Sequence, residues 1–245
     1  VVIFAQIFGI PGGSSGGGGG RKPTVTIPDD VPTGLNGDDH FAYIVGYPDG
    51  NVEPNGNITR AEVATIFFRL LTEEVRTANS TQSNSLSDVT RGQWFNHAVS
   101  TLSSMGIVKG HNDGTFAPNA PITRAEFATI ALRFADKTAD GTNPFTDVAS
   151  NDWYYFAVLN AVGFGWITGY SDGTFRPNAS ITRAEVATIV NRMLGRLADF
   201  DAIDAGAGRR FPDVSKTFWG FYDIVEATSE HTYTFDSELL HEKWN

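Results

Sequence analysis

A stretch of nine residues that occurs three times decides how this chain is read. Ile58-Thr-Arg-Ala-Glu-Val-Ala-Thr-Ile66 returns at residues 122–130, with Phe in place of Val, and unchanged at residues 181–189. The copies begin 64 and 59 residues apart, and eight of the nine positions are identical in all three. Recurrence at this period indicates one structural unit for each copy.

The repeated stretch has the features of a helix start. In Thr59-Arg-Ala-Glu62 the Thr hydroxyl can accept from the amide three residues on, and the Glu carboxylate can reach back to the Thr amide, which is a capping box. Apolar residues at helical spacing follow, as at Val63, Ile66 and Phe67, so each copy predicts an amphipathic helix. The residues assigned to helix capping are Thr59, Thr123, Thr182, Glu62, Glu126 and Glu185.

Helix formation does not explain the arginine of each copy. Arg60, Arg124 and Arg183 stand at the first helical position, where the helix dipole disfavours a cation by roughly 0.3–1 kcal/mol. One explanation is a structural ion pair with an Asp of a second repeated element, in which an Asp precedes a Trp by six residues. Another is an external anion, held by the Arg together with the free amides of the helix start. Both can hold at once, and the sequence leaves the choice open.

A glycine turn precedes each copy at a constant distance. The turns are Gly46-Tyr-Pro-Asp-Gly50, Gly110-His-Asn-Asp-Gly114 and Gly169-Tyr-Ser-Asp-Gly173. Asp-Gly is a strong turn signal because glycine adopts positive φ without strain. The first glycine of each turn, at Gly46, Gly110 and Gly169, can in addition let a ligand approach the backbone.

A second repeated element contains an Asp and, six residues later, a Trp. The three pairs are Asp88 with Trp94, Asp147 with Trp153, and Asp213 with Trp219, and a short helical pattern follows each Trp. A tryptophan beside a helix start packs into a core or, together with polar groups, forms a sugar-binding surface.

The two elements are out of phase along the chain. The turn-plus-helix element comes first, and the Asp–Trp element comes last. A closed, circularly permuted unit with three-fold pseudo-symmetry explains this order. It predicts that the C-terminal Asp–Trp element, residues 211–230, packs against residues 41–76.

Composition excludes several classes of protein. The 245 residues are 41% hydrophobic, carry a formal net charge of -10 and include no cysteine. The charge argues against nucleic acid as a partner. The longest apolar run, residues 1–10, is about half of a membrane span, so membrane insertion is not expected. Disulfides and cysteine-based zinc sites are excluded.

No enzyme, cofactor or metal site is expected. The five histidines are not repeated and have no metal-ligand spacing, and no nucleophile or phosphate-loop motif occurs. A calcium loop aligned on Gly114 would place Lys109 and Ala120 at its first and last ligand positions, where carboxylates are required.

Taken together, the three Ile-Thr-Arg-Ala-Glu copies, the Asp-Gly turns and the Asp–Trp elements resemble S-layer homology (SLH) modules. The resemblance covers residues 36–235. It implies a mainly α fold in which each module has a short helix, a Gly/Asp-rich loop and a longer helix. Three modules would close into one pseudo-three-fold prism, here with an N-terminal β-like stub.

The same resemblance implies non-covalent anchoring of a surface protein to the cell wall of a Gram-positive-type bacterium. The partner would be secondary cell-wall polysaccharide, commonly a pyruvylated amino sugar, bound in grooves between modules. Protein–protein contact or self-assembly of a surface layer through the same grooves is the alternative. The sequence does not decide between a monomer and a member of a surface array.

Site residues follow by position in the motifs. The arginines Arg60, Arg124 and Arg183 would hold the ketal carboxylate, and the aspartates and tryptophans of the second element would line the grooves. Two departures weaken the match. No Asp–Trp element precedes the first module, and the second has His111 where the others have Tyr47 and Tyr170.

The expected organisation has six segments. Residues 1–11 end an upstream strand or domain, 12–35 form a Gly/Ser/Pro linker, and 36–80 form the first module, which 211–235 complete. Residues 81–138 and 139–198 form the second and third modules, and 199–245 form a C-terminal half-module and tail.

Overall fold

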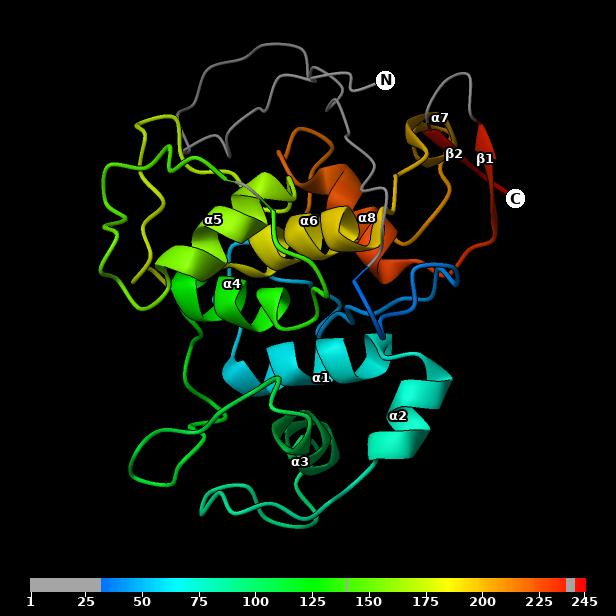
Figure 1. Cartoon of the computed structure of the whole chain (residues 1–245). Helices are drawn as coiled ribbons and strands as arrows, with labels where there is room; N and C mark the ends of the chain where they lie inside the picture. Colours follow the sequence, from blue (N-terminus) through cyan, green and yellow to red (C-terminus); the bar gives the residue numbers. More distant parts are fainter. Residues whose placement is uncertain (1–31, 140, 237–240) are drawn as a thin grey trace.

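The computed structural model describes residues 32–139, 141–236 and 241–245, which form a mainly helical fold (Figure 1). The predicted β-like stub at 1–11 and most of the predicted linker lie outside the described residues. The helices are α1 (Arg60–Leu70), α2 (Glu73–Asn79), α3 (Asn96–Ser104), α4 (Arg124–Leu132), α5 (Tyr155–Gly163), α6 (Arg183–Leu194), α7 (Phe200–Asp204) and α8 (Phe221–Thr228). The strands are β1 (Tyr233–Asp236) and β2 (His241–Trp244), which pair antiparallel.

The three repeated stretches form α1, α4 and α6, and the capping box predicted for each of them is present. The apolar positions of these helices are buried, including Val63 and Ile66 in α1 and Val186 in α6. Each of the three helices is therefore an element of the core. In the second repeat α3 and α4 both have nine residues, so the expected short and longer helix are equal there.

The residues just before these helices bond to one another in a cycle. The amide of Ile58 donates to the carbonyl of Ile181 at 3.2 Å, and that of Ile181 donates to Ile122 at 3.0 Å. The amide of Ile122 donates back to Ile58 at 3.1 Å. Each repeat is thus joined to both of the others.

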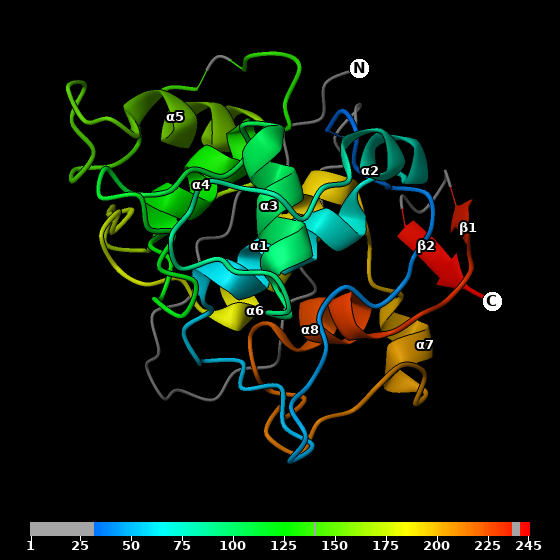
Figure 2. The same ribbon diagram turned by 90° about the horizontal axis from the view of Figure 1, so that it is seen from below.

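The Asp–Trp elements connect neighbouring repeats. Helix α3 packs against α1, α5 against α4, and α8 against α6 (Figures 1 and 2). The Asp before each outer helix bonds to the loop ahead of a different inner helix from the one that the outer helix packs against. Asp88 bonds to the loop before α4, Asp147 to the loop before α6, and Asp213 accepts from the amides of Val52 and Glu53 before α1. The contact that the sequence predicts between the last element and the first turn is therefore present.

The C-terminal hairpin lies beside the first described segment. His40 forms a bridge with His231, and the His231 amide donates to the His40 carbonyl at 3.0 Å. On the hairpin, the Trp244 amide donates to Asp199 just before α7. Among the described residues, no helix is long and apolar enough to cross a bilayer.

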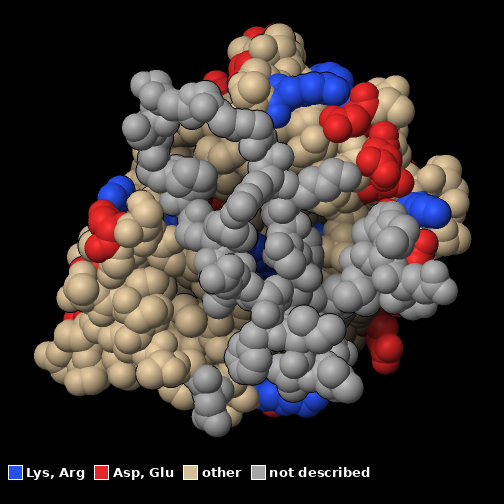
Figure 3. Space-filling view, turned by 90° about the horizontal axis from the view of Figure 1, so that it is seen from above, with Lys and Arg blue, Asp and Glu red and all other residues tan. Residues whose placement is uncertain are grey.

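Charges of both signs are interspersed on the described part of one face of the molecule (Figure 3). On the face shown in Figure 3, the blue Lys and Arg side chains lie apart from one another and close to red Asp and Glu side chains.

Candidate functional site

The three repeated arginines form a cycle of ion pairs with the repeated glutamates. Arg60 pairs with Glu126, Arg124 with Glu185, and Arg183 with Glu62, each with an N–O distance of 2.8 Å. Each pair joins two repeats. The ion-pair explanation named an Asp as the partner, and that detail is wrong: the partner is the capping Glu of another copy, whose second oxygen serves the capping box.

Backbone carbonyls hold the rest of each guanidinium. Nε of Arg60 donates to the Phe116 carbonyl at 2.7 Å, and Nη2 donates to the Lys109 carbonyl at 3.0 Å. Arg124 donates in the same way to the carbonyls of Phe175 and Thr168. Arg183 donates to those of Val52 and Val45. Three of the five guanidinium donors thus have protein acceptors at each site.

The first amides of each helix are also paired. In α1 the amide of Arg60 donates to Ala120, and that of Ala61 donates to Pro118, both at 3.0 Å. The carbonyls of residues 177 and 179 accept from the first two amides of α4, and those of residues 54 and 56 accept from the first two amides of α6. An anion held by free helix amides would have to displace these bonds.

The three junctions differ in how open they are. The side chains of Arg124 and Glu185 are 1% and 5% exposed, so this pair is the most enclosed. Glu62 and Glu126 are 21% and 26% exposed. The Arg60–Glu126 junction is therefore the most accessible to a ligand, and Arg60 itself is 9% exposed.

A tyrosine closes two of the three junctions. The hydroxyl of Tyr47 donates to Glu62 at 3.0 Å, and that of Tyr170 donates to Glu185 at 2.8 Å. Burial raises the pKa of Tyr47 to about 12, so its hydroxyl keeps the proton that it donates. At the Glu126 junction this position is His111, whose side chain is exposed. The departure noticed in the sequence coincides with the most open junction.

The repeated aspartates hold the loops that follow the turns. Asp88 accepts from the amides of Phe116 and Ala117, both at 2.7 Å, and Asp147 makes the same pair of bonds one repeat later. Ala117 has a φ of 54°, in the left-handed region that an L-residue adopts at a cost. The carboxylate therefore fixes a strained backbone.

The first glycine of each turn leaves space for an apolar residue of the Asp–Trp element. A Cβ atom on Gly46, Gly110 or Gly169 would overlap Phe211, Leu86 or Phe145, respectively, and would also meet a backbone carbonyl oxygen at 2.7–2.8 Å. The requirement for glycine is thus explained by packing within the protein.

The tryptophans lie before the helices rather than inside them, and two of them are on the surface. Trp94 and Trp153 are 63% and 66% exposed, whereas Trp219 is only partly so. The residues that enter the core are their neighbours Phe95 and Tyr154. Trp94 and Trp153 therefore offer open aromatic faces.

Sequence reasoning did not assign the aromatic side chains that stack on the arginines. Arg60 lies over the ring of Phe116, and Arg124 lies over Tyr170 and Phe175, all at 4.8 Å from the ring centre. The recurrence of Thr-Phe just after two of the Asp-Gly turns was the available signal.

Comparison with known proteins identifies the repeats. Residues 42–64, 85–128 and 144–187 match the S-layer homology domain. Over 229 residues the chain is 38% identical to Cell surface glycoprotein 1 of Acetivibrio thermocellus, an alignment of 89% of this chain and 10% of that protein. It is 35% identical over 230 residues to the Cellulosome-anchoring protein of the same organism, across 91% of this chain and 50% of that protein.

A third relative is the Surface layer protein of Brevibacillus choshinensis, which is 37% identical over 40% of this chain and 9% of its own length. The chain thus contains three S-layer homology modules. Its relatives are cell-surface, S-layer and cellulosome-anchoring proteins, of which it spans half the length or less.

Proposed function

We propose that this chain anchors a surface protein to the bacterial cell wall by binding secondary cell-wall polysaccharide non-covalently, without catalysing a reaction. The observation that carries the proposal is the match of all three repeats to the S-layer homology domain. The names of the relatives, among them a cellulosome-anchoring protein, favour a place on the cell surface.

The proposal includes closure of the three modules into one pseudo-three-fold prism. The cyclic bonds among Ile58, Ile122 and Ile181 support it, and so do the three Arg–Glu pairs that each join two repeats. The grooves of such a prism would lie between neighbouring modules, where the loops held by Asp88, Asp147 and Asp213 meet the helix starts.

We assign sugar stacking to the exposed tryptophans Trp94 and Trp153, with a lesser part for Trp219. Flat aromatic faces suit the apolar side of a pyranose. A ligand carboxylate, such as the ketal of a pyruvylated sugar, is assigned to Arg60 first, because its junction is the most open. Two of its five donors remain after the three protein bonds, enough for a bidentate grip.

Arg124 and Arg183 are assigned the same role in the other two grooves. Charge-assisted hydrogen bonds contribute about 1.5–3 kcal/mol each, so a single groove binds modestly. Several grooves on a repetitive polymer gain on the order of 10²–10⁴ in avidity.

Co-sedimentation with purified Gram-positive cell walls tests the proposal. The purified 245-residue chain is expected to pellet with intact walls and to stay in solution when acid has stripped the secondary polysaccharide and left the peptidoglycan. Equal pelleting with both preparations would exclude the polysaccharide as the partner.

A paired variant locates the surface. Trp94→Ala with Trp153→Ala should reduce pelleting strongly and leave the thermal melt unchanged, since both rings are exposed. Phe235→Ala is the matched control, because Phe235 is 47% exposed and lies on β1, outside the matched modules. If the tryptophan variant pellets with walls as well as the wild type does, these rings are not part of the binding surface. If the wild-type chain pellets only together with other copies of a surface protein and not with walls, self-assembly is favoured instead.

A further inference from the structure

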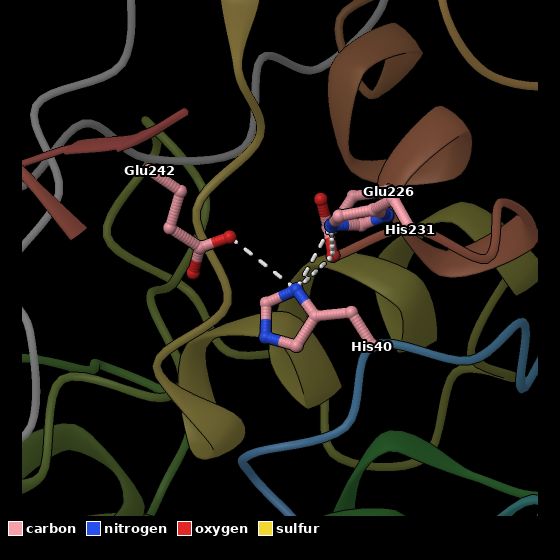
Figure 4. Close-up of side chains that lie close together, drawn as sticks. All are labelled: His40, Glu226, His231 and Glu242. Atoms are coloured by element: carbon pink, nitrogen blue, oxygen red, sulfur yellow. Dashed lines mark hydrogen bonds and ion pairs between the residues drawn. The ribbon is translucent and has the colours of Figure 1, made fainter. Parts of the chain in front are cut away.

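A buried group of two histidines and two glutamates lies outside the three ion-pair junctions. His40 comes from the first described segment, Glu226 from α8, His231 from the residues before β1, and Glu242 from β2 (Figure 4). His40, Glu226 and Glu242 are 4%, 0% and 2% exposed, and the His231 side chain is 5% exposed. The chain brings these residues together from positions up to about 200 apart.

The ligand atoms of the other three residues lie around Nδ1 of His40. Nδ1 of His40 lies 2.9 Å from Nε2 of His231, 3.2 Å from Oε1 of Glu226 and 3.3 Å from Oε2 of Glu242. Nε2 of His231 lies 3.5 Å from Oε1 of Glu226, and all four atoms lie within 4.8 Å of one another. Figure 4 shows Glu242 on one side of the His40 ring, and Glu226 and His231 on the other.

These separations suit a tetrahedral metal centre. Ligand atoms 2.0–2.1 Å from a zinc ion lie about 3.3 Å apart at the corners of a tetrahedron. Four of the six separations fall between 2.9 and 3.5 Å. The other two, from Glu242 to Glu226 and to His231, are no longer than 4.8 Å, so metal binding would draw Glu242 inward by at most about 1.5 Å.

The carboxylate oxygens in this group lack the partners that buried oxygens require. Within the described residues both oxygens of Glu226 and Oε2 of Glu242 make no well-formed hydrogen bond, although His40 Nδ1 lies 3.2 Å and 3.3 Å from the two carboxylates and the Trp244 indole approaches Glu226. The other oxygen of Glu242 accepts from the Leu197 amide at 2.9 Å, which fixes the carboxylate with Oε2 turned toward His40. Buried carboxylates are stable when they are paired or when they bind a metal.

The group offers the ligand types that a divalent transition metal takes, two imidazole nitrogens and two carboxylate oxygens. The nearby Arg196 donates to the carbonyls of residues 39 and 41.

A hollow beside the group provides a route of entry. It has a volume of about 430 Å³, includes His40 and His231 in its lining, and has Asp38, Asp39 and Glu230 around it. Acidic side chains at the mouth attract cations. The rings of Tyr233 and Trp244 stack on His40 and His231 and fix their orientation.

We propose that His40, Glu226, His231 and Glu242 bind one divalent transition-metal ion, with zinc as the expected occupant. Two imidazole ligands disfavour calcium and magnesium, which prefer oxygen. The ion would join the first described segment of the fold to its C-terminal hairpin. Spacing along the sequence gave no sign of the site, since residues 40 and 231 are far apart in the chain.

Titration of the purified, tag-free chain with Zn²⁺ after dialysis against a chelator tests this site. Calorimetry should give one high-affinity equivalent of Zn²⁺, and Co²⁺ should produce the intense visible absorption of a tetrahedral site. Glu242→Gln, which preserves side-chain shape, and His231→Ala should each weaken Zn²⁺ binding by at least the roughly 10–100-fold that loss of an outer-shell partner costs, since each removes a ligand. His111→Ala is the control, because His111 is exposed and outside the group.

Three results would overturn the proposal: no stoichiometric uptake by the wild-type chain, an octahedral Co²⁺ spectrum, or a Zn²⁺ affinity that only His111→Ala reduces. The wild-type titration and spectrum do not depend on a variant that folds. Circular dichroism of Glu242→Gln separates loss of a ligand from loss of the fold. The Zn²⁺ titration does not measure cell-wall binding, so its outcome is independent of whether the proposed function is right.

Discussion

At the scale of single residues, the arginine in each repeat is explained by a partner that lies in another repeat. Each of these cations stands at the positive end of a helix dipole, and the capping glutamate of another module offsets this cost. The glutamate therefore has two roles, as a cap within its own helix and as the acceptor of an arginine. Buried pairs of this kind are destabilising when one partner is removed, because the other charge is left without compensation.

Arg124→Ala should lower the free energy of unfolding by about 3–5 kcal/mol. Arg124 is the most enclosed of the three arginines, and its loss leaves Glu185 buried with one donor fewer. Urea denaturation followed by circular dichroism measures the change.

Arg176→Ala is the matched control for that substitution. Arg176 also pairs with a carboxylate at 2.8 Å, but both partners are about half exposed, so its loss should leave the stability close to that of the wild type. Equal stability of the two variants would mean that the buried pairs do not hold the modules together. It would also favour a ligand-binding role alone for Arg124.

At the scale of elements, the helix starts are where sequence reasoning succeeds. A capping box and an apolar stripe are local patterns, so α1, α4 and α6 and their buried faces follow from the repeated nine residues. The ion pairs could not be derived in this way, because Arg60 and Glu126 are 66 residues apart and many acidic residues compete as partners. The exposure of Trp94 likewise depends on how its neighbour Phe95 fills the core.

Thr182→Ala should cost about 1 kcal/mol of stability, because the hydroxyl accepts from the Glu185 amide at the start of α6. Thr182→Ser keeps this hydroxyl and should stay within a few tenths of a kcal/mol of the wild type. Thermal denaturation of the two variants side by side tests the cap. A serine variant as unstable as the alanine variant would show that the methyl group, and not the hydroxyl, is required.

In the whole molecule, the C-terminal Asp–Trp element bonds to the loop of the first repeat. Asp213 accepts hydrogen bonds from the loop amides at residues 52–53, as Asp88 and Asp147 do from the loops of the second and third repeats. The order of elements in the sequence predicted this contact. The His40–Glu226–His231–Glu242 group had no such signal, because its members are not repeated and only the fold brings them together.

Asp213→Ala should destabilise the protein as much as Asp88→Ala and Asp147→Ala, by about 1–3 kcal/mol each, since each leaves two loop amides without their acceptor. In all three variants the transitions followed by tryptophan fluorescence and by circular dichroism should coincide, as in one cooperative unit. A chain of three independent modules would instead give separate transitions, with only the C-terminal part affected by Asp213→Ala.

Calorimetric titration of this chain with soluble secondary cell-wall polysaccharide, released from walls by acid, measures the proposed binding itself. We expect saturable binding to the wild-type chain. The variant with Trp94→Ala and Trp153→Ala should lose this binding and keep its melting temperature, and Phe235→Ala should bind normally. A wild-type chain that gives no heat of binding and still pellets with intact walls would contradict the proposed function, because the anchor would then recognise another component of the wall.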